Sequence, residues 1–258
     1  AMDELNNAED AVQDRMMMVL LDEMNLARVE YYFSDFLSRL ESRPSRDAVD
    51  DPNLRKDAEI ELEIPNAVTR IFPGYNLLFA GTMNEDESTQ SLSDKVVDRA
   101  NVMRFGAPRS IAQSKHMTDA SPIRALSRKT WDQWCHGKLA NSDAARVDSS
   151  VQEMLGLMQD FGKPFGHRLG RAIKAYTTVY PEVEGVGDRV GTALADQLEM
   201  RLLPKLRGVD VEEFSTEFEK LEGLANKFQD ELLAEAIKQS VEAAETTGQF
   251  VWKGVIRQ

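Results

Sequence analysis

Two short apolar runs, each followed by polar residues, constrain the fold of this 258-residue chain more than any other feature. Residues 16–21 read MMMVLL and end at Asp22 and Glu23, while residues 76–81 read NLLFAG and lead to Asn84. Continuous apolar runs of this length are typical of strands that are buried on both faces of a parallel sheet. We therefore expect two neighbouring strands whose polar ends meet at one edge of a sheet.

The segments around these runs complete an α/β pattern up to about residue 105. Residues 58–64 alternate acidic and apolar side chains, as a half-exposed strand does. Residues 93–101 are expected to form a short helix, and residues 102–105 a third short strand. One face of an amphipathic helix is predicted by the spacing of Val29, Tyr32, Phe33, Phe36, Leu37 and Leu40.

The second half of the chain has almost wholly helical periodicity. Residues 214–245 should form one long helix or two consecutive ones, and residues 249–257 a short strand or a loose tail. The fold class is thus α/β followed by all-α. We predict an α/β subdomain at 1–107, a connecting or inserted segment at 108–148, and a helical subdomain at 149–258.

Composition excludes several classes of protein. A net charge of −13 argues against a wide nucleic-acid footprint, since phosphate contacts need clustered Lys and Arg. The single cysteine, Cys135, cannot form an internal disulfide, which fits a reducing cytoplasm. The three histidines lie far apart, without the spacing of a zinc site. No run of eighteen apolar residues is present, so a membrane-spanning helix is not expected.

The carboxylates that follow the first run can be interpreted as catalytic groups or as a structural feature of the strand. In nucleoside triphosphatases, an acid pair at this place serves Mg²⁺ with its first member, Asp22 here, and polarises the attacking water with its second, Glu23. The structural alternative is that both acids are the solvated end of a strand. Asn84, at the tip of the neighbouring strand, can hydrogen-bond the γ-phosphate and the attacking water.

Three arginines could contribute to such a site from elsewhere in the chain. Arg99 could reach the phosphate of a neighbouring subunit as an arginine finger. Arg168 and Arg171 lie near the start of a predicted helix, where a lid arginine could contact nucleotide. The alternative for each is a solvated side chain or one that pairs with a carboxylate.

The motifs together resemble a known family. The stretches LLDEMNLARVEYYFSDFLSRLE, NLLFAGTMNEDESTQSLSDKVVDRAN and ALADQLEMRLLPKLRG are similar to the AAA+ module of McrB-type proteins, from about residue 16 to 208. The resemblance implies an incomplete P-loop NTPase core with a helical lid, part of a ring-forming motor in DNA restriction or phage defence. In that family the matching positions are the Walker B acids Asp22 and Glu23, the signature Asn25, sensor 1 Asn84, the finger Arg99, and Arg168 or Arg171 in the sensor 2 region.

One motif of that family is missing. The Walker A loop, G-x-x-x-x-G-K-[ST], should precede Walker B, because its backbone N–H groups and lysine hold the phosphates. No such loop occurs, and its nearest imitation, at 156–164, has five residues between its glycines and proline in place of the hydroxyl. We therefore expect the chain to be the C-terminal part of a larger motor and to be inactive by itself.

The resemblance also implies cofactors and partners for the full-length protein. These are Mg²⁺ with GTP or ATP, a ring of identical subunits, a McrC-like nuclease, and DNA reached through other domains or partners, with no membrane. A non-catalytic AAA-like scaffold is the alternative function. A PD-(D/E)xK nuclease is disfavoured, because the acids at 57–65 lack a lysine at the required spacing.

Overall fold

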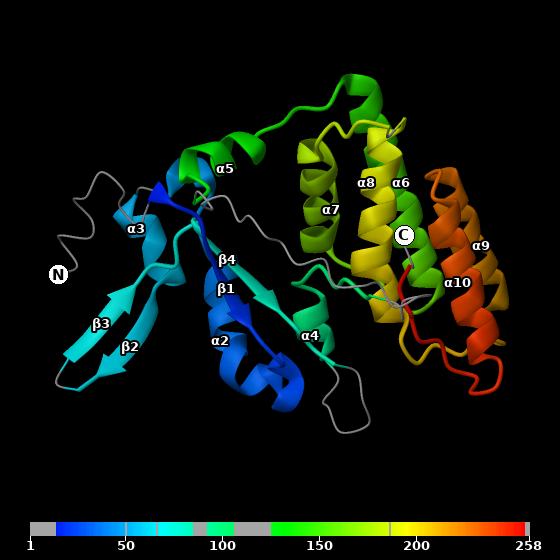
Figure 1. Ribbon diagram of the computed structural model, residues 1–258, viewed down its shortest axis with the longest axis horizontal. Helices are drawn as coiled ribbons and strands as arrows, with labels where there is room; N and C mark the ends of the chain where they lie inside the picture. The colour runs from blue at the N-terminus through cyan, green and yellow to red at the C-terminus, as the bar shows by residue number, and fades with distance from the viewer. Residues whose placement is uncertain are drawn as a thin grey trace, which may run out of the picture. The chain divides into compact units, whose positions relative to one another are not determined.

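The computed structural model describes residues 14–49, 51–65, 67–84, 92–105, 125–185 and 187–255. These residues form two compact units, which Figure 1 shows as ribbons. The first contains the described residues up to Arg99 together with 125–135, and the second contains 100–105 and 136–255. Of the predicted connecting segment, residues 108–124 lie outside the described residues, and the remainder is divided between the two units.

The first unit is built on a parallel pair of strands, β1 (Met17–Leu21) and β4 (Leu77–Gly81). Their register places Met17 opposite Leu77 and Leu21 opposite Gly81, so the two strands end together. Helix α2 (Val29–Glu41) packs on this pair through aromatic side chains. The Phe79 ring of β4 lies 4.7 Å from the Phe36 ring and 6.2 Å from the Phe33 ring. These elements occur where the sequence predicts them.

The expectation that the first strand is buried on both faces is wrong for the described residues. Side chains alternate between the two faces of a strand, and Met18 and Leu20 are 65% and 60% exposed, while Val19 and Leu21 are partly buried. The described residues thus cover only one face of β1. Val19 and Leu21 pack on the covered face, while Met18 and Leu20 on the other face, the outer face, are exposed.

A hairpin, β2 (Ile60–Ile64) and β3 (Ala67–Ile71), separates α2 from β4 along the chain. Its first strand forms where the alternating pattern predicts one, but Leu62 and Ile64 are 40% and 50% exposed, so the expected half-buried face is largely exposed among the described residues. Its second strand was not predicted. Glu61 of β2 forms an ion pair with Arg70 of β3 at 3.2 Å. The short helices of the first unit are η2 (Met24–Leu26), η3 (Arg46–Ala48), α3 (Pro52–Arg55), η4 (Lys56–Ala58), α4 (Asp94–Val97) and α5 (Arg128–Trp134).

The predicted short strand at 102–105 does not form. The backbone N–H of Val102 donates to the carbonyl of Met200 at 3.0 Å, and the Arg104 guanidinium donates to the carbonyl of Trp252 at 2.5 Å. Both partners belong to the second unit, in which residues 102–105 have no regular secondary structure. Hydrogen bonds to carbonyls of two separate segments hold these residues, where the prediction expected a neighbouring strand.

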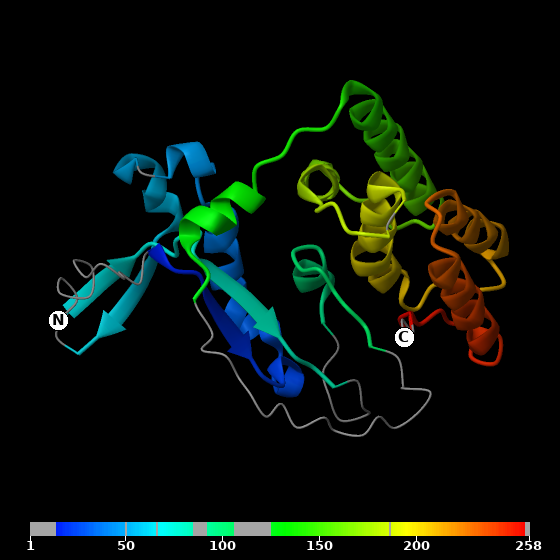
Figure 2. The ribbon, with the colours of Figure 1, turned by 45° about the horizontal axis from the view of Figure 1, so that its top comes forward.

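The second unit is helical, as predicted. Its helices α9 and α10 lie side by side in both ribbon views (Figure 1, Figure 2), so the predicted helical stretch at 214–245 is two helices. The elements are α6 (Asn141–Asp160), α7 (His167–Val179), α8 (Arg189–Gln197), a π-helical turn η5 (Leu198–Leu202), η6 (Leu203–Leu206), α9 (Ser215–Lys227) and α10 (Glu231–Ala244).

The C-terminal segment of the second unit is a fixed part of its core. Phe250 and Trp252 are 0% and 1% exposed, and the backbone of Phe250 exchanges hydrogen bonds with that of Val209 and Gly208 at 2.8 and 2.9 Å. The loose-tail alternative is therefore wrong for residues 249–255. No helix in the described part of the chain is both long enough and apolar enough to cross a membrane.

Asp188 joins two helices of the second unit. Its carboxylate accepts a hydrogen bond from the N–H of Gly191 at 3.0 Å, which caps α8. It also receives two from the guanidinium of Arg146 in α6, at 2.8 and 2.5 Å. The hydrogen bonds from Arg146 hold the pKa of the Asp188 carboxyl below its ordinary value.

We expect Asp188→Ala to lower the free energy of unfolding by about 1–2 kcal/mol, since it removes a cap and an ion pair. Asp188→Asn keeps the cap and should cost less. Because the folded pKa is lowered, the stabilisation from the charge is present above about pH 4 and disappears as pH falls through the folded value. Urea denaturation should therefore show a smaller gap between wild type and Asp188→Asn in acid than at neutral pH. An equal gap would contradict this account.

Candidate functional site

Four of the predicted site residues, Asp22, Glu23, Asn25 and Asn84, meet at the carboxyl end of the parallel pair. Asp22 and Glu23 follow β1 directly, and Asn84 lies three residues after β4. Parallel strands that end in register present the segments that follow them at the same sheet edge. The expectation that Asn84 follows a neighbouring strand agrees with the observed pairing. Residues 22–25 form a tight turn at this edge, the acid turn.

Thr82 holds the acid turn against the end of β4. Its hydroxyl accepts a hydrogen bond from the backbone N–H of Glu23 at 3.0 Å and donates one to the carboxylate of Asp22. Its backbone N–H donates to the carbonyl of Leu21, and its carbonyl accepts from the N–H of Met24, both at 2.9 Å. Four hydrogen bonds therefore connect one threonine to four consecutive residues of the chain. Thr82 was not predicted, because a threonine after a strand carries no specific sequence signal, in contrast to acids and asparagines.

The backbone of Glu23 has an uncommon conformation. With φ 50° and ψ 44° it lies in the left-handed region, which few residues other than glycine adopt. Such a conformation costs on the order of 1–3 kcal/mol and persists only where surrounding contacts enforce it. The hydrogen bonds to Thr82 supply that enforcement. Next to it, a Cβ at Gly81 would lie 2.1 Å from the sulfur of Met24, so a larger residue there would displace the Met24 side chain.

Asn25 is the buried member of the acid turn, at 1% exposure. Its side-chain amide donates to the backbone carbonyl of Asn84 at 2.7 Å. The two asparagines that the sequence singles out are thus bonded to each other across the strand ends. In this geometry the Asn25 side chain fixes the segment that carries Asn84, while Asp22, Glu23 and Asn84 are exposed at the edge.

Arg99 lies just after α4 and is held within its own unit. Its guanidinium forms an ion pair with Glu41, at the end of α2, with an Nε–Oε1 distance of 2.7 Å. Both side chains are largely buried, at 20% and 25% exposure. The structural alternative named for this arginine, a carboxylate partner, is therefore present. Reaching the phosphate of another subunit would require Arg99 to leave Glu41.

The two lid candidates belong to the second unit. Arg168 and Arg171 lie in the first two turns of α7, and both are exposed. Their assignment to nucleotide contact stays a prediction, and the choice between them stays open.

The donors at the acid turn fit Mg²⁺ in the form that phosphate-transferring enzymes use. Mg²⁺ is commonly held there by one or two protein carboxylates, with phosphates and water as its other ligands. Asp22 supplies such a carboxylate, and its hydrogen bond from Thr82 orients it. The described residues contain no cluster of three or more His, Cys, Asp or Glu that could hold a metal by protein ligands alone. In the form of site described above, phosphates and water would complete the coordination of a metal at Asp22.

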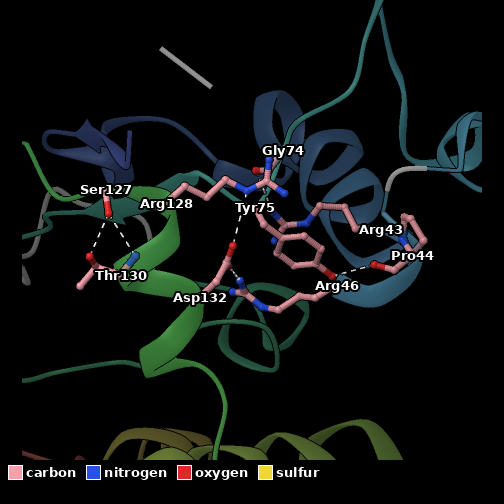
Figure 3. Close-up of polar contacts among 9 residues, drawn as sticks. All are labelled: Arg43, Pro44, Arg46, Gly74, Tyr75, Ser127, Arg128, Thr130 and Asp132. Carbon is pink, nitrogen blue, oxygen red and sulfur yellow. Dashed lines mark hydrogen bonds and ion pairs between the residues drawn. The ribbon is translucent and has the colours of Figure 1, made fainter. Parts of the chain in front are cut away.

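A second polar cluster in the first unit was not predicted from the sequence. The Tyr75 ring contacts the guanidinium groups of Arg43 and Arg46, at 4.4 and 4.6 Å from its centre (Figure 3). The Tyr75 hydroxyl donates to the carbonyl of Pro44 at 2.9 Å, and Arg43 donates to that of Gly74 at 3.2 Å. These contacts fasten the end of α2 to the turn before β4. Burial lowers the pKa of Arg43.

The same cluster anchors α5. Asp132 accepts a hydrogen bond from Arg46 and lies 3.6 Å from Arg128, one helical turn away (Figure 3). The Ser127 hydroxyl caps the helix by accepting from the N–H of Thr130 at 3.1 Å. Every cation of this cluster has a protein partner, which indicates a structural clamp. Sequence patterns could not show it, since its members are up to 89 residues apart.

Comparison with known proteins gives one match. A family model described as "Domain of unknown function (DUF8727)" matches residues 123–250, just under half of the chain. No curated protein and no solved structure matches the chain. The matched range includes α5 to α10 and with them both lid candidates, while the acid turn, Asn84 and Arg99 precede it. The match assigns no function and does not reach the acid turn, so the roles proposed there remain predictions.

Replacing Asn25 with aspartate tests the link between the strand ends. Asn25→Asp substitutes an acceptor for the donor that faces the Asn84 carbonyl, so the free energy of unfolding should fall by about 1–3 kcal/mol. Urea denaturation measures this. The control is Asn53→Asp, the same change at an exposed position of α3, which should stay within about 0.5 kcal/mol of wild type. Equal effects of the two variants would contradict the role of Asn25.

Cys135 reports whether α5 is in place. Burial raises the pKa of its thiol, Arg46 opposes that shift, and Asp132 adds to it. Because the thiolate is the reactive form, alkylation by iodoacetamide should need a higher pH in the folded protein than in urea. Mass spectrometry gives a clean readout, since Cys135 is the single cysteine. Asp132→Asn should move the folded profile to lower pH. Identical profiles for folded and unfolded wild type would refute this.

Proposed function

We propose that this chain is part of a McrB-type AAA+ nucleoside triphosphatase, a motor that powers DNA restriction or phage defence. One observation carries the proposal: the acids after β1 and Asn84 after β4 converge at the carboxyl edge of a parallel strand pair. Ligand sites of α/β sheets lie at that edge. The bond between Asn25 and the Asn84 carbonyl supports it further, because it fixes both segments in one arrangement.

The roles at the edge follow from the chemistry of phosphoryl transfer. Asp22 would hold Mg²⁺, and Glu23 would accept a hydrogen bond from the attacking water and orient it. Asn84 donates its side-chain amide to the γ-phosphate or to the same water. Bound Mg²⁺ would neutralise charge that develops on the phosphate oxygens. Catalysis of this kind depends on position more than on covalent chemistry, so the fixed turn matters to it.

The phosphate cradle has to come from outside these 258 residues, which contain no Walker A motif. Without backbone N–H groups and a lysine around the phosphates, two carboxylates repel a triphosphate. We therefore expect the chain by itself to bind nucleotide weakly and not to hydrolyse it. The full-length protein would use GTP or ATP.

The arginines belong to the same proposal. Arg99 acts as a finger towards the next subunit of a ring, after exchanging Glu41 for the phosphate. Arg168 or Arg171 contacts nucleotide from the helical lid. A McrC-like nuclease is the proposed partner, the location is the cytoplasm, and DNA is reached through other domains or partners. The net charge of −13 is consistent with this indirect contact.

A non-catalytic AAA-like scaffold is the second candidate. Two observations favour it: the missing Walker A motif and the ion pair that engages Arg99 with Glu41. A scaffold would keep the acid turn as a structural joint between strands and would have no use for a free finger. Turnover by the full-length protein separates the two functions.

Glu23→Gln in the full-length protein tests the catalytic role directly. Nucleotide binding should be retained, because Asp22 and the phosphate contacts stay in place. Phosphate release should fall by about a hundredfold or more, since one positioned catalytic group is lost. Glu63→Gln, at an exposed position of β2, is the control and should leave turnover unchanged. A wild-type protein that never hydrolyses nucleotide would favour the scaffold.

Arg99→Ala tests whether the arginine acts across a subunit boundary. Turnover should fall by about 10³-fold or more, and mixing Arg99→Ala with Glu23→Gln subunits should restore part of it, because some interfaces then pair an intact Glu23 with an intact Arg99. Glu41→Gln weakens the ion pair without removing the finger and should leave turnover within a few-fold. If mixing restores nothing while Glu41→Gln is as damaging as Arg99→Ala, the arginine has a structural role within its own subunit.

A further inference from the structure

The side chain of Thr82 makes contacts at the acid turn that its backbone does not. Its backbone N–H and carbonyl bond to Leu21 and Met24, and almost any residue at this position could make those two bonds. The hydroxyl alone reaches the Asp22 carboxylate and the Glu23 N–H. A hydroxyl can donate and accept at once, as this place requires. A threonine is therefore needed at position 82 for the contacts with Asp22 and Glu23, and not for the backbone hydrogen bonds.

Each of these side-chain bonds fixes a different property. The bond to Asp22 orients the carboxylate and occupies one of its oxygens. The bond from the Glu23 N–H secures a residue in a left-handed conformation, which determines the direction in which its side chain leaves the turn. Threonine is β-branched and has few χ1 rotamers, so its hydroxyl is held in place at little further cost in entropy.

We propose that Thr82 is a positioning residue for the reaction at this edge: its hydroxyl sets the orientation of Asp22 towards the metal and of Glu23 towards the attacking water. This inference rests on the proposed NTPase function. It assigns to the threonine a part in metal affinity and in turnover, beyond its part in folding. A merely structural Thr82 would affect the stability of the protein and leave both of those quantities unchanged.

The test compares three variants of the full-length protein. Thr82→Val keeps the shape and removes both side-chain bonds, and Thr82→Ser keeps the hydroxyl. Thr69→Val makes the same change at an exposed position of β3 and serves as the matched control. Two measurements are made: amide hydrogen exchange at Glu23 without nucleotide, and the Mg²⁺ dependence of phosphate release with saturating nucleotide.

For Thr82→Val we expect exchange at Glu23 to accelerate by about tenfold or more, as loss of a hydrogen bond to a folded amide implies. The Mg²⁺ concentration for half-maximal turnover should rise by about tenfold, and kcat should fall by at least a similar factor. Thr82→Ser should stay within about threefold of wild type in each quantity, because hydroxyl bonds of comparable strength remain. Thr69→Val should match wild type.

The possible outcomes separate this inference from the function on which it rests. If wild type hydrolyses nucleotide and Thr82→Val keeps its Mg²⁺ dependence and kcat, the positioning role is wrong and the NTPase stands. If wild type does not hydrolyse nucleotide, the proposed function falls and the positioning role falls with it. In that case accelerated exchange at Glu23 would assign the hydroxyl to folding alone, and unchanged exchange would exclude that role as well.

Discussion

The parallel pairing of β1 with β4 is the constraint on which the rest of the first unit depends. Parallel strands cannot be joined by a tight turn, so the 55 residues between them, 22–76, have to leave the sheet and return. That excursion contains α2, which covers one face of the pair, and the β2–β3 hairpin. The same pairing brings the two polar strand ends to one edge. Coverage of the sheet and assembly of the candidate site thus have one cause.

Strongly periodic elements and the meeting of the two polar strand ends were predictable from the sequence, and tertiary details were not. The spacing of apolar residues in α2 predicts a helix, and the continuous apolar run in β1 predicts a strand. Strand β3 was missed, because Val68, Thr69 and Arg70 mix apolar and polar side chains without a clear alternation. The tail around Trp252 was read as loose or as a short strand, since a few residues show no period, yet the tail is buried by contacts with distant segments.

The candidate site shows the same division. Acids after one strand and an asparagine after the next predict that the two segments meet, since sheet geometry allows little else. Neither the Glu41 partner of Arg99 nor the Thr82 hydroxyl has a sequence signal, because both depend on exact distances between segments some 60 residues apart. The region matched by the family model adds a further point: it starts near α5, which packs in the first unit, and continues through the helices of the second. The matched domain is therefore not identical with either compact unit.

The exposed outer face of β1 has a consequence for chemical damage and for its use as a probe. Met18, on this face, is 65% exposed, and exposed thioethers are readily oxidised to sulfoxides. A sulfoxide at Met18 would place a polar group on the face that any covering layer must contact. Oxidation before assembly would then hinder coverage of this face, whereas coverage first would protect the sulfur. The oxidation state of one methionine could thus record whether the sheet of this chain has been covered.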